Sequence, residues 1–282
     1  MGASHGAGLR AAVEVALRED APSGDLTSSV IVPETAVCRA ELRFKSDGIL
    51  AGTEAAQMAF DIVAEQDRLG PVEVAWKLRD GERVRTGDVA AVVEGPARSI
   101  LRAERVAINF LGHLSGVATL TSQFVQAAKP AQVLCTRKTT PGLRSLERDA
   151  VVAGGGSLHR GSLSDAVLIK DNHLRVAGGV TRAVRAARTS GVPVEVEVET
   201  TEELEEALAA GAERILLDNP SPEVVREAVA RVGDPGRLEI SGGVTLDSVP
   251  LLVKAGARVI SVGRITHSAP SLDLSLEVTD VR

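Results

Sequence analysis

The sequence predicts an α/β protein in which a complete or partial β/α barrel follows a smaller region of mixed helix and strand. Six short apolar runs alternate with helix-length segments after the first third of the chain, which is typical of a parallel sheet with right-handed crossovers. Six such units suit a barrel better than an open sheet, and a doubly wound sheet is the alternative. The length of 282 residues fits two domains or one large barrel.

The first third of the chain predicts one helix and several short strands before a long helix. Residues 9–19 have helical spacing, and strand-like runs separated by glycines follow at residues 38–44, 72–78 and 88–93. The long helix is expected over residues 99–128. Its polar residues at i, i+3, i+7 and i+11 lie on one face and form either a functional stripe or an ordinary solvated one: Arg102, Arg105, Asn109 and His113.

The rest of the chain predicts the barrel. The expected strands are residues 133–139, 166–171, 194–199, 214–219, 238–242 and 259–264. The expected helices are residues 180–190, 202–210, 222–232 and 246–255.

Composition excludes several classes of protein. The net charge of -6 does not favour nucleic acid or an anionic membrane as a partner, and aromatic residues at 2% cannot supply base-stacking platforms. No apolar run is long enough to span a membrane. Two cysteines, Cys38 and Cys135, form no disulfide framework and fit a reducing compartment, so we expect a cytoplasmic protein.

Polar residues at the strand ends predict the position of an active site, since β/α barrels carry theirs at the carboxyl ends of the strands. The alternative is that these residues are ordinary strand-end caps. They are Arg137 and Lys138, Lys170 to His173, Glu197, Asp218 and Asn219, Ser241 to Gly243, and Gly263 with Arg264.

Three groups within this set indicate a phosphorylated, anionic substrate. The Ser241-Gly242-Gly243 run, followed by an expected helix, favours a phosphate, as does Gly263. The carboxylates of Glu197 and Asp218 suit Mg²⁺, unless the run of alternating glutamates is the solvated face of an edge strand. Six cationic residues that fall within 34 positions, 137 to 170, indicate a polyanion site or, alternatively, a basic surface patch: Arg137, Lys138, Arg144, His159, Arg160 and Lys170.

These motifs resemble the quinolinate phosphoribosyltransferase family, also called carboxylating nicotinate-nucleotide pyrophosphorylases. The central matches are residues 135–144 (CTRKTTPGLR), 154–160 (GGGSLHR) and 168–173 (LIKDNH). Outer matches include residues 19–27 (EDAPSGDLT), 113–119 (HLSGVAT), 195–198 (EVEV), 217–219 (LDN), 241–243 (SGG) and 266–268 (THS). The resemblance covers nearly the whole chain.

The resemblance implies an incomplete β/α barrel with an N-terminal α/β sandwich domain. The implied domains are residues 1–112 and 113–267, with the tail 268–282 returning to the first. It further implies a homodimer or higher oligomer with shared active sites. The implied reaction transfers phosphoribosyl from phosphoribosyl pyrophosphate to quinolinate and releases pyrophosphate and carbon dioxide, with Mg²⁺ and no organic cofactor.

The resemblance also implies roles for individual residues. The catalytic set is Lys138, Lys170, Glu197 and Asp218, of which Glu197 and Asp218 serve Mg²⁺ directly or through water or pyrophosphate. The acceptor carboxylates would meet Arg137, His159, Arg160, Lys170 and, from the neighbouring subunit, Arg105. The remaining substrate-binding residues, mostly for the 5′-phosphate, are Ser241, Gly242, Gly243, Gly263 and His267.

Three positions depart from the usual family pattern. Leu158 stands where the family has Asn, Ser162 where it has Gly, and Arg148-Asp149 where it has Lys-Tyr. These changes leave another aromatic carboxylate open as the acceptor. Two different functions also stay open: a barrel aldolase that forms a Schiff base on Lys138 or Lys170, and a non-catalytic sensor of a phosphorylated metabolite.

Overall fold

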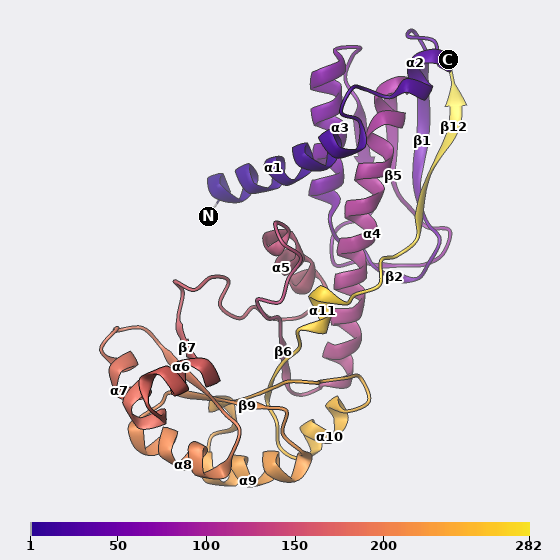
Figure 1. Cartoon of the computed structure of the whole chain (residues 1–282). Coiled ribbons are helices and arrows are strands. Elements are labelled where there is room, and N and C mark those ends of the chain that lie inside the picture. Colours follow the sequence, from indigo (N-terminus) through magenta and orange to yellow (C-terminus); the bar gives the residue numbers. More distant parts are fainter. Residues whose placement is uncertain (1) are drawn as a thin grey trace. The chain divides into compact units, whose positions relative to one another are not determined.

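The computed structural model describes residues 2–282, which divide into two compact units (Figure 1). One unit holds the residues up to 120, residues 140–155 and residues 268–282. The other holds residues 121–139 and 156–267. The expected boundary between residues 112 and 113 lies inside a single helix, α4 (Ala97–Ala127), which runs from the first unit into the second.

The first unit is built on a four-stranded antiparallel sheet in the order β12-β1-β5-β3. These strands are β1 (Val37–Phe44), β3 (Glu73–Trp76), β5 (Val89–Pro96) and β12 (Leu274–Val281). A two-stranded sheet pairs β2 (Gly48–Ile49) with β4 (Arg83–Val84). The helices are α1 (Gly2–Asp20), α2 (Leu26–Ile31), α3 (Thr53–Asp67), α5 (Arg144–Ala153) and most of α4.

The sequence of β1 explains how this sheet is anchored. Its buried and exposed residues alternate, so that Cys38, Ala40, Leu42 and Phe44 face the core. β12 pairs with β1 along its length, which joins the C-terminal segment to the N-terminal sheet. Gly116 on α4 allows the chain before β12 to pass closely, because a Cβ atom there would lie 2.1 Å from the carbonyl oxygen of Pro270.

The second unit is a curved sheet of six parallel strands in the order β6-β11-β10-β9-β8-β7. Its strands are β6 (Gln132–Leu134), β7 (Val167–Ile169), β8 (Val194–Val198), β9 (Arg214–Asp218), β10 (Leu238–Ser241) and β11 (Val259–Ser261). The last strand pairs with the first, and every other neighbour is consecutive in the chain. This is the cyclic order of a β/α barrel that is open between β6 and β7, so the incomplete barrel is confirmed and the doubly wound alternative is wrong.

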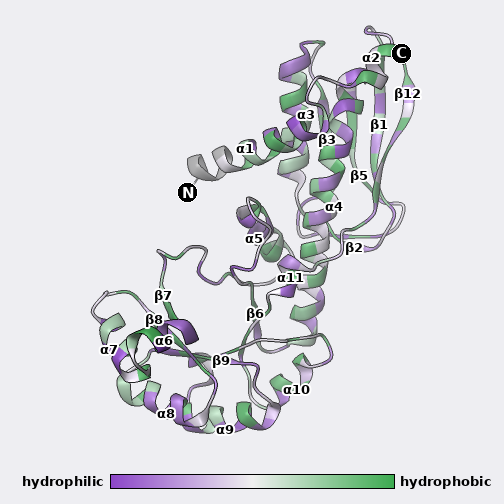
Figure 2. Ribbon diagram, viewed as in Figure 1, coloured by the Kyte–Doolittle hydropathy of each residue, from purple (hydrophilic) through white to green (hydrophobic). Residues whose placement is uncertain are grey.

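Helices cover the outside of this sheet, where Figure 1 shows α7 to α10 in a row. The helices are α6 (Asp171–Ala177), α7 (Val180–Arg188), α8 (Thr201–Ala210), α9 (Pro222–Val232), α10 (Val249–Lys254) and α11 (Arg264–His267), with a 3₁₀ turn at Pro235–Arg237. They carry hydrophobic and hydrophilic residues together (Figure 2). Thr200 and Ser221 are the N-caps of α8 and α9. α9 begins at the expected residue 222, and α8 begins one residue before the expected 202.

The opening between β6 and β7 is partly filled by the segment around Ser157. Leu134 and Ser157 form a parallel bridge, and the Ser157 amide donates a 2.8 Å hydrogen bond to the carbonyl of Val133. This bridge therefore places His159 and Arg160, the next residues after Leu158, at the edge of the barrel interior. No helix among residues 2–282 is long and apolar enough to cross a membrane.

Candidate active site

A cavity of about 580 Å³ lies at the carboxyl ends of the second unit's strands. Every strand of the sheet contributes lining residues, either at its last positions or in the loop that follows. Of the candidate residues, the lining includes Arg137, Lys138, His159, Arg160, Lys170, Glu197, Asp218, Ser241, Gly242, Gly243, Gly263 and His267. The carboxyl edge of the sheet therefore brings together residues that span 131 positions of the sequence, from 137 to 267.

Arg144, one of the six cationic residues, begins α5 in the first unit, and the cavity lining does not include it. The lining does not include Arg105 either. It is exposed on α4, within the first unit. Its neighbours on the expected polar face are not a uniform solvated stripe. Arg102 pairs with Asp67, and the His113 ring contacts the buried carboxylate of Glu147 at 2.8 Å.

The loop after β6 carries Lys138 and is held by α11, which follows the neighbouring strand β11. The Thr266 hydroxyl donates a 2.7 Å hydrogen bond to the carbonyl of Lys138. Gly263 lies close to Lys138 and His267. A Cβ atom at residue 263 would be 3.2 Å from Lys138 Cδ and 3.3 Å from His267 Nε2. Any side chain at residue 263 would thus press on two candidate ligands.

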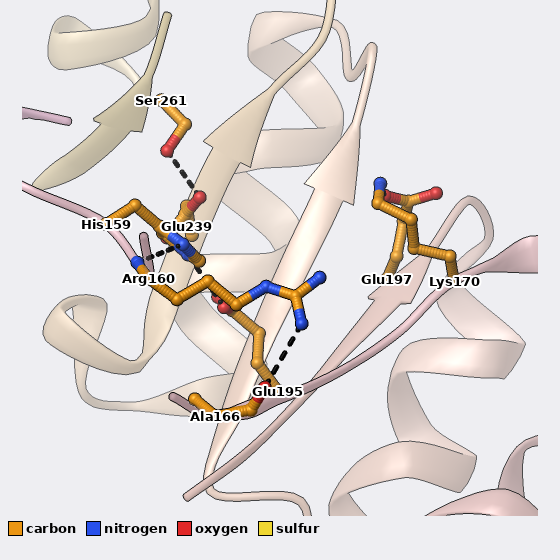
Figure 3. A network of polar contacts seen from close by, with 8 residues as sticks. All are labelled: His159, Arg160, Ala166, Lys170, Glu195, Glu197, Glu239 and Ser261. Atoms are coloured by element: carbon orange, nitrogen blue, oxygen red, sulfur yellow. Dashed lines mark hydrogen bonds and ion pairs between the residues drawn. The ribbon is translucent and has the colours of Figure 1, made fainter. Parts of the chain in front are cut away.

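Lys170 and Glu197 form an ion pair across the ends of β7 and β8 (Figure 3). Glu197 shares its inward strand face with Glu195, while the valines between them face the opposite side. β8 lies between β7 and β9, and Glu195 is only 6% exposed. The alternative of a solvated edge-strand face is therefore wrong.

Asp218 ends β9 and is held by the residue that follows it. The Asn219 side-chain amide donates a 2.7 Å hydrogen bond to Asp218 Oδ2, and the Asn219 backbone amide donates a 2.8 Å bond to the carbonyl of Ser241. Asn219 takes the left-handed conformation, with φ of 52°, that Asn tolerates better than most residues. This arrangement ties the end of β9 to the end of β10.

The glycine run after β10 is a turn rather than the start of a helix. Gly242 and Gly243 both have left-handed φ values, 86° and 55°. The expected helix N-terminus directly behind them is wrong, because α10 begins only at Val249. α11 does begin immediately after Gly263, but it is a single turn of four residues. Any phosphate would therefore be bound by the open turn itself.

A buried cluster around His159 lies deeper in the barrel (Figure 3). Its ring Nε2 is 3.1 Å from Glu195 Oε2 and 3.4 Å from Glu239 Oε2, while Nδ1 is 2.8 Å from the Arg160 amide nitrogen. Glu239 also accepts a hydrogen bond from the Ser261 hydroxyl. The Arg160 guanidinium donates a 3.1 Å hydrogen bond to the carbonyl of Ala166.

Burial and charge shift the ionisation of this cluster. Hydrogen bonds to Glu195 and then Glu239 raise the pKa of His159 to about 9, against the opposing effect of burial. Burial raises the pKa of the Glu195 carboxyl. Burial, and after it the positive charge of Arg137, lowers the pKa of Arg160. Two cationic side chains that disfavour each other's charge would be stabilised by an anionic ligand.

The charged ring and the neutral ring differ at Nδ1. A neutral ring with hydrogen on Nε2 leaves a lone pair on Nδ1 for the Arg160 amide, whereas the charged ring carries hydrogen on both nitrogens. The amide contact therefore describes the neutral form, and the carboxylates favour the charged one. In both the neutral and the charged form, Nε2 carries a hydrogen and faces the carboxylates of Glu195 and Glu239.

Glu239 and Ser261 are lining residues that the motif analysis missed. A signal was present, because Glu239 lies two residues before Ser241 in an otherwise apolar strand and so shares its inward face. Within residues 2–282, the cluster of His159, Glu195 and Glu239 is also the one group of three side chains close enough to hold a metal ion. Glu197 and Asp218 would supply two carboxylates to an ion that completes its shell elsewhere.

Comparison with known proteins places these features in a family context. Residues 25–115 match the quinolinate phosphoribosyl transferase N-terminal domain, and residues 117–277 match its C-terminal domain. A probable carboxylating nicotinate-nucleotide pyrophosphorylase of Bacillus subtilis (strain 168) is 43% identical over 266 residues, covering 93% of this chain and 90% of its own. The chloroplastic enzyme of that name from Arabidopsis thaliana is 39% identical, with 96% and 82% covered. The nicotinate-nucleotide pyrophosphorylase structure from Francisella tularensis aligns with a TM-score of 0.90 at 36% identity and covers 96% of both chains.

Proposed function

The chain belongs to the quinolinate phosphoribosyltransferase family, and from this premise we infer the reaction that its cavity carries out. It transfers phosphoribosyl from phosphoribosyl pyrophosphate (PRPP) to quinolinate, giving nicotinate mononucleotide, pyrophosphate and carbon dioxide. The observation that carries this conclusion is the cavity's division of charge. Cationic side chains of Arg137, Lys138 and Arg160 line the same space as the carboxylates of Glu197 and Asp218.

The cationic side chains are proposed to bind quinolinate through its two ring carboxylates. Arg137 and Arg160 lie close enough for one charge to lower the pKa of the other group, and a dianion between them removes that repulsion. Planar guanidinium groups suit carboxylates because they donate two parallel hydrogen bonds. Lys170 adds a third positive charge at the end of β7. Held at both carboxylates, the ring would present its nitrogen in one direction only.

The open turn of Gly242 and Gly243, together with Ser241 and Gly263, is proposed to bind the 5′-phosphate of PRPP. Two successive left-handed glycines form a turn with no side chains of its own, and backbone amides in such a turn favour anions. Lys138 and His267 flank Gly263 at close range. We assign Lys138 to the pyrophosphate, where its charge stabilises the leaving group.

Glu197 and Asp218 are proposed to serve the ribose. As pyrophosphate leaves, positive charge develops at the anomeric carbon, and nearby carboxylates stabilise it. Their oxygens also fit Mg²⁺, which takes one or two protein carboxylates and completes its shell from water and phosphate. When bound, Mg²⁺ would neutralise charge on the pyrophosphate. Lys170 and Asn219 hold the two carboxylates in place before any substrate arrives.

The decarboxylation follows from the transfer itself. Once the ring nitrogen forms its bond to the anomeric carbon, the ring carries a positive charge. The carbon–carbon bond to the adjacent carboxylate then breaks, carbon dioxide leaves, and the electron pair stays on the ring carbon beside the cationic nitrogen until a proton replaces it. The ring is its own electron sink, so this step needs no organic cofactor.

The departures from the family pattern lie outside the cavity lining, so they give no reason to replace quinolinate as the acceptor. Leu158 is 43% exposed, and neither it nor Ser162 is among the cavity-lining residues. The Gly161 amide and the Ser162 side chain bind Asp165 within their own loop. Arg148 and Asp149 lie on α5, in the other unit. A Schiff-base aldolase is disfavoured at Lys170, since that chemistry needs a neutral amine and Glu197 pairs with the ammonium.

We further propose that the active protein is a homodimer with shared sites in a reducing compartment such as the cytoplasm. Arg105 is exposed on α4 of the first unit and is not among the lining residues of the second unit's cavity. The family resemblance assigns this arginine to the site of the neighbouring subunit. Cys38 and Cys135 are both buried and free, which suits a reducing environment.

Mass spectrometry of the products tests the reaction. The protein is mixed with PRPP, Mg²⁺ and quinolinate, and a parallel mixture contains nicotinate instead. We expect nicotinate mononucleotide and carbon dioxide from quinolinate alone. Product from nicotinate would mean that the second carboxylate is not recognised, and absence of product from either acid would reject the proposed acceptor.

A further inference from the structure

Glu195 and Glu239 are the most deeply buried acidic side chains of the barrel, at 6% and 3% exposure. Each has one oxygen without a hydrogen-bond partner among the described residues, Oε1 in Glu195 and Oε2 in Glu239. Burying two carboxylates is costly unless a positively charged or donor group compensates. The His159 ring faces both carboxylates. The cost of burying them is therefore linked to holding this ring in one position.

The contacts form a continuous path from the strand interior to the cavity (Figure 3). Ser261 binds Glu239, and the Glu239 and Glu195 carboxylates face His159 Nε2. The opposite nitrogen, Nδ1, faces the backbone amide of Arg160 at 2.8 Å. A rotation of the imidazole would break both sets of contacts at once.

We propose that Glu195 and Glu239 are positioning residues for acceptor binding, which act by holding His159 Nε2 and thereby set the direction in which Arg160 enters the cavity. This inference rests on the proposed function, in that Arg160 is taken to bind an acceptor carboxylate. Glu195 and Glu239 touch no substrate in this scheme. Their effect reaches the acceptor through the His159 ring and the Arg160 backbone.

The same three side chains could instead hold a metal ion, and the hydrogen-bond geometry argues against it. A metal on Nε2 requires that nitrogen to give up its hydrogen, which places the ring hydrogen on Nδ1. Nδ1 would then be a donor facing the amide donor of Arg160 at 2.8 Å. With hydrogen on Nε2, the ring donates to Glu195 Oε2 and faces Glu239 Oε2, while Nδ1 accepts from the Arg160 amide.

Steady-state kinetics of four variants test the proposal: Glu239→Ala, Glu239→Gln, Glu195→Gln and Ile240→Val. Glu239→Ala removes the carboxylate that faces Nε2 at 3.4 Å, and we expect the KM for quinolinate to rise about tenfold, the scale seen when an outer partner that orients a functional group is lost. The KM for PRPP should stay within about twofold. Glu239→Gln keeps a side-chain oxygen that can face His159 Nε2–H, so its KM for quinolinate should be close to that of the wild type. Glu195→Gln also keeps such an oxygen and should behave like Glu239→Gln.

Ile240→Val is the matched control, because it trims a buried residue of the same strand on the opposite face. It should lower the melting temperature and leave both KM values unchanged. Glu239→Gln as impaired as Glu239→Ala would overturn the positioning role. An equal rise of both KM values in Glu239→Ala would also overturn it, since general loosening of the barrel would then explain the effect.

A second measurement needs no turnover. Nitrogen-15 NMR of the imidazole rings distinguishes Nε2 from Nδ1, and the chain has only five histidines, so a His159→Gln sample assigns the signal. Hydrogen on Nε2 supports the proposal, and Nε2 without hydrogen overturns it. One equivalent of zinc in the purified protein, lost in Glu239→Ala, would overturn it as well. Failure of the wild-type protein to convert quinolinate would reject the proposed function, and the NMR result would still decide how His159 is held.

Discussion

The side-chain amide of Asn219 donates a hydrogen bond of 2.7 Å to the carboxylate of Asp218. The two residues are adjacent, and the bond forms because Asn219 adopts a left-handed backbone with φ of 52°. A strained residue beside a candidate catalytic carboxylate is a feature associated with functional sites. The side chain of Asn219 thus holds the Asp218 carboxylate while its backbone amide stays bonded to Ser241 at the end of β10.

We therefore expect Asn219→Gly to lower kcat about tenfold with little change in the KM for quinolinate. Glycine keeps the left-handed backbone at low cost, so the change isolates the lost amide. Asn219→Ala should show the same kcat loss and an additional destabilisation of about 1 kcal/mol from its Cβ atom. Steady-state kinetics and thermal melts measure both effects, and an unchanged kcat in Asn219→Gly would show that Asp218 needs no support.

Gly242→Ala should weaken PRPP binding by more than its backbone strain explains. A Cβ atom at residue 242 would lie 2.5 Å from Asn219 Cγ, and the residue has φ of 86°. Gly233→Ala is the matched control, since Gly233 has φ of 76° and nothing within 4 Å of the added atom. Both variants should lose about 1–2 kcal/mol of stability from the left-handed backbone. Only Gly242→Ala should raise the KM for PRPP, and equal KM values in the two variants would place the phosphate elsewhere.

Glu147→Ala should destabilise the first unit by about 2–3 kcal/mol. Its buried carboxylate binds the His113 ring at 2.8 Å and accepts a 3.1 Å hydrogen bond from the Thr140 amide. Removing it leaves both groups without this partner. Val152→Ala on the same helix is the control, because Val152 is 52% exposed and should change little. Thermal unfolding measures the difference, and equal melting temperatures would show that water replaces the carboxylate without cost.

Arg105→Ala should be rescued in mixed dimers if the sites are shared. One parent carries Arg105→Ala and the other carries Asp218→Asn, so each homodimer lacks a proposed site residue. A mixed dimer restores one site that has both wild-type residues. We expect about half of the wild-type activity per mixed dimer, measured after co-expression with two affinity tags. Mixed dimers no more active than either parent would contradict the sharing of sites through Arg105.

The sequence predicted the barrel well because each of its strands is marked by a short run of apolar residues. Six apolar runs became six strands, and the expected helix over residues 222–232 matches α9 in full. The strand expected over residues 166–171 ends earlier, since β7 stops at Ile169 and Asp171 begins α6. The pairing of β12 with β1 joins residues more than 200 positions apart, and no local periodicity encodes such a partner.

Most candidate residues could be predicted from the sequence because they lie at, or just after, the ends of recognisable strands. Residues at those ends lie in one cavity because parallel strands finish at the same edge of a sheet. Glu239 was overlooked because it lies within a strand, where a single glutamate resembles an exposed residue until its buried neighbours are known. Its contact with His159 depends on the segment at Ser157 bridging to β6, which the glycines before it do not predict.

The ionisation of His159 should make stability depend on pH in the neutral to alkaline range. Glu195 and Glu239 raise the pKa of His159 to about 9, whereas an unfolded histidine titrates near pH 6.5. A folded pKa above the unfolded value stabilises the protein fully below about pH 6.5, and this contribution is lost as the pH rises toward 9. The linkage is of the order of 2 kcal/mol.

Thermal melts between pH 6 and pH 10 would measure this effect in the wild type and in His159→Gln. The wild type should lose its stability advantage over the variant as the pH rises from about 7 to 9.5, with the steepest change between the two pKa values. Parallel curves for the two proteins would mean that the His159 ring is already neutral at pH 7, with the Arg160 amide on Nδ1 as its permanent partner.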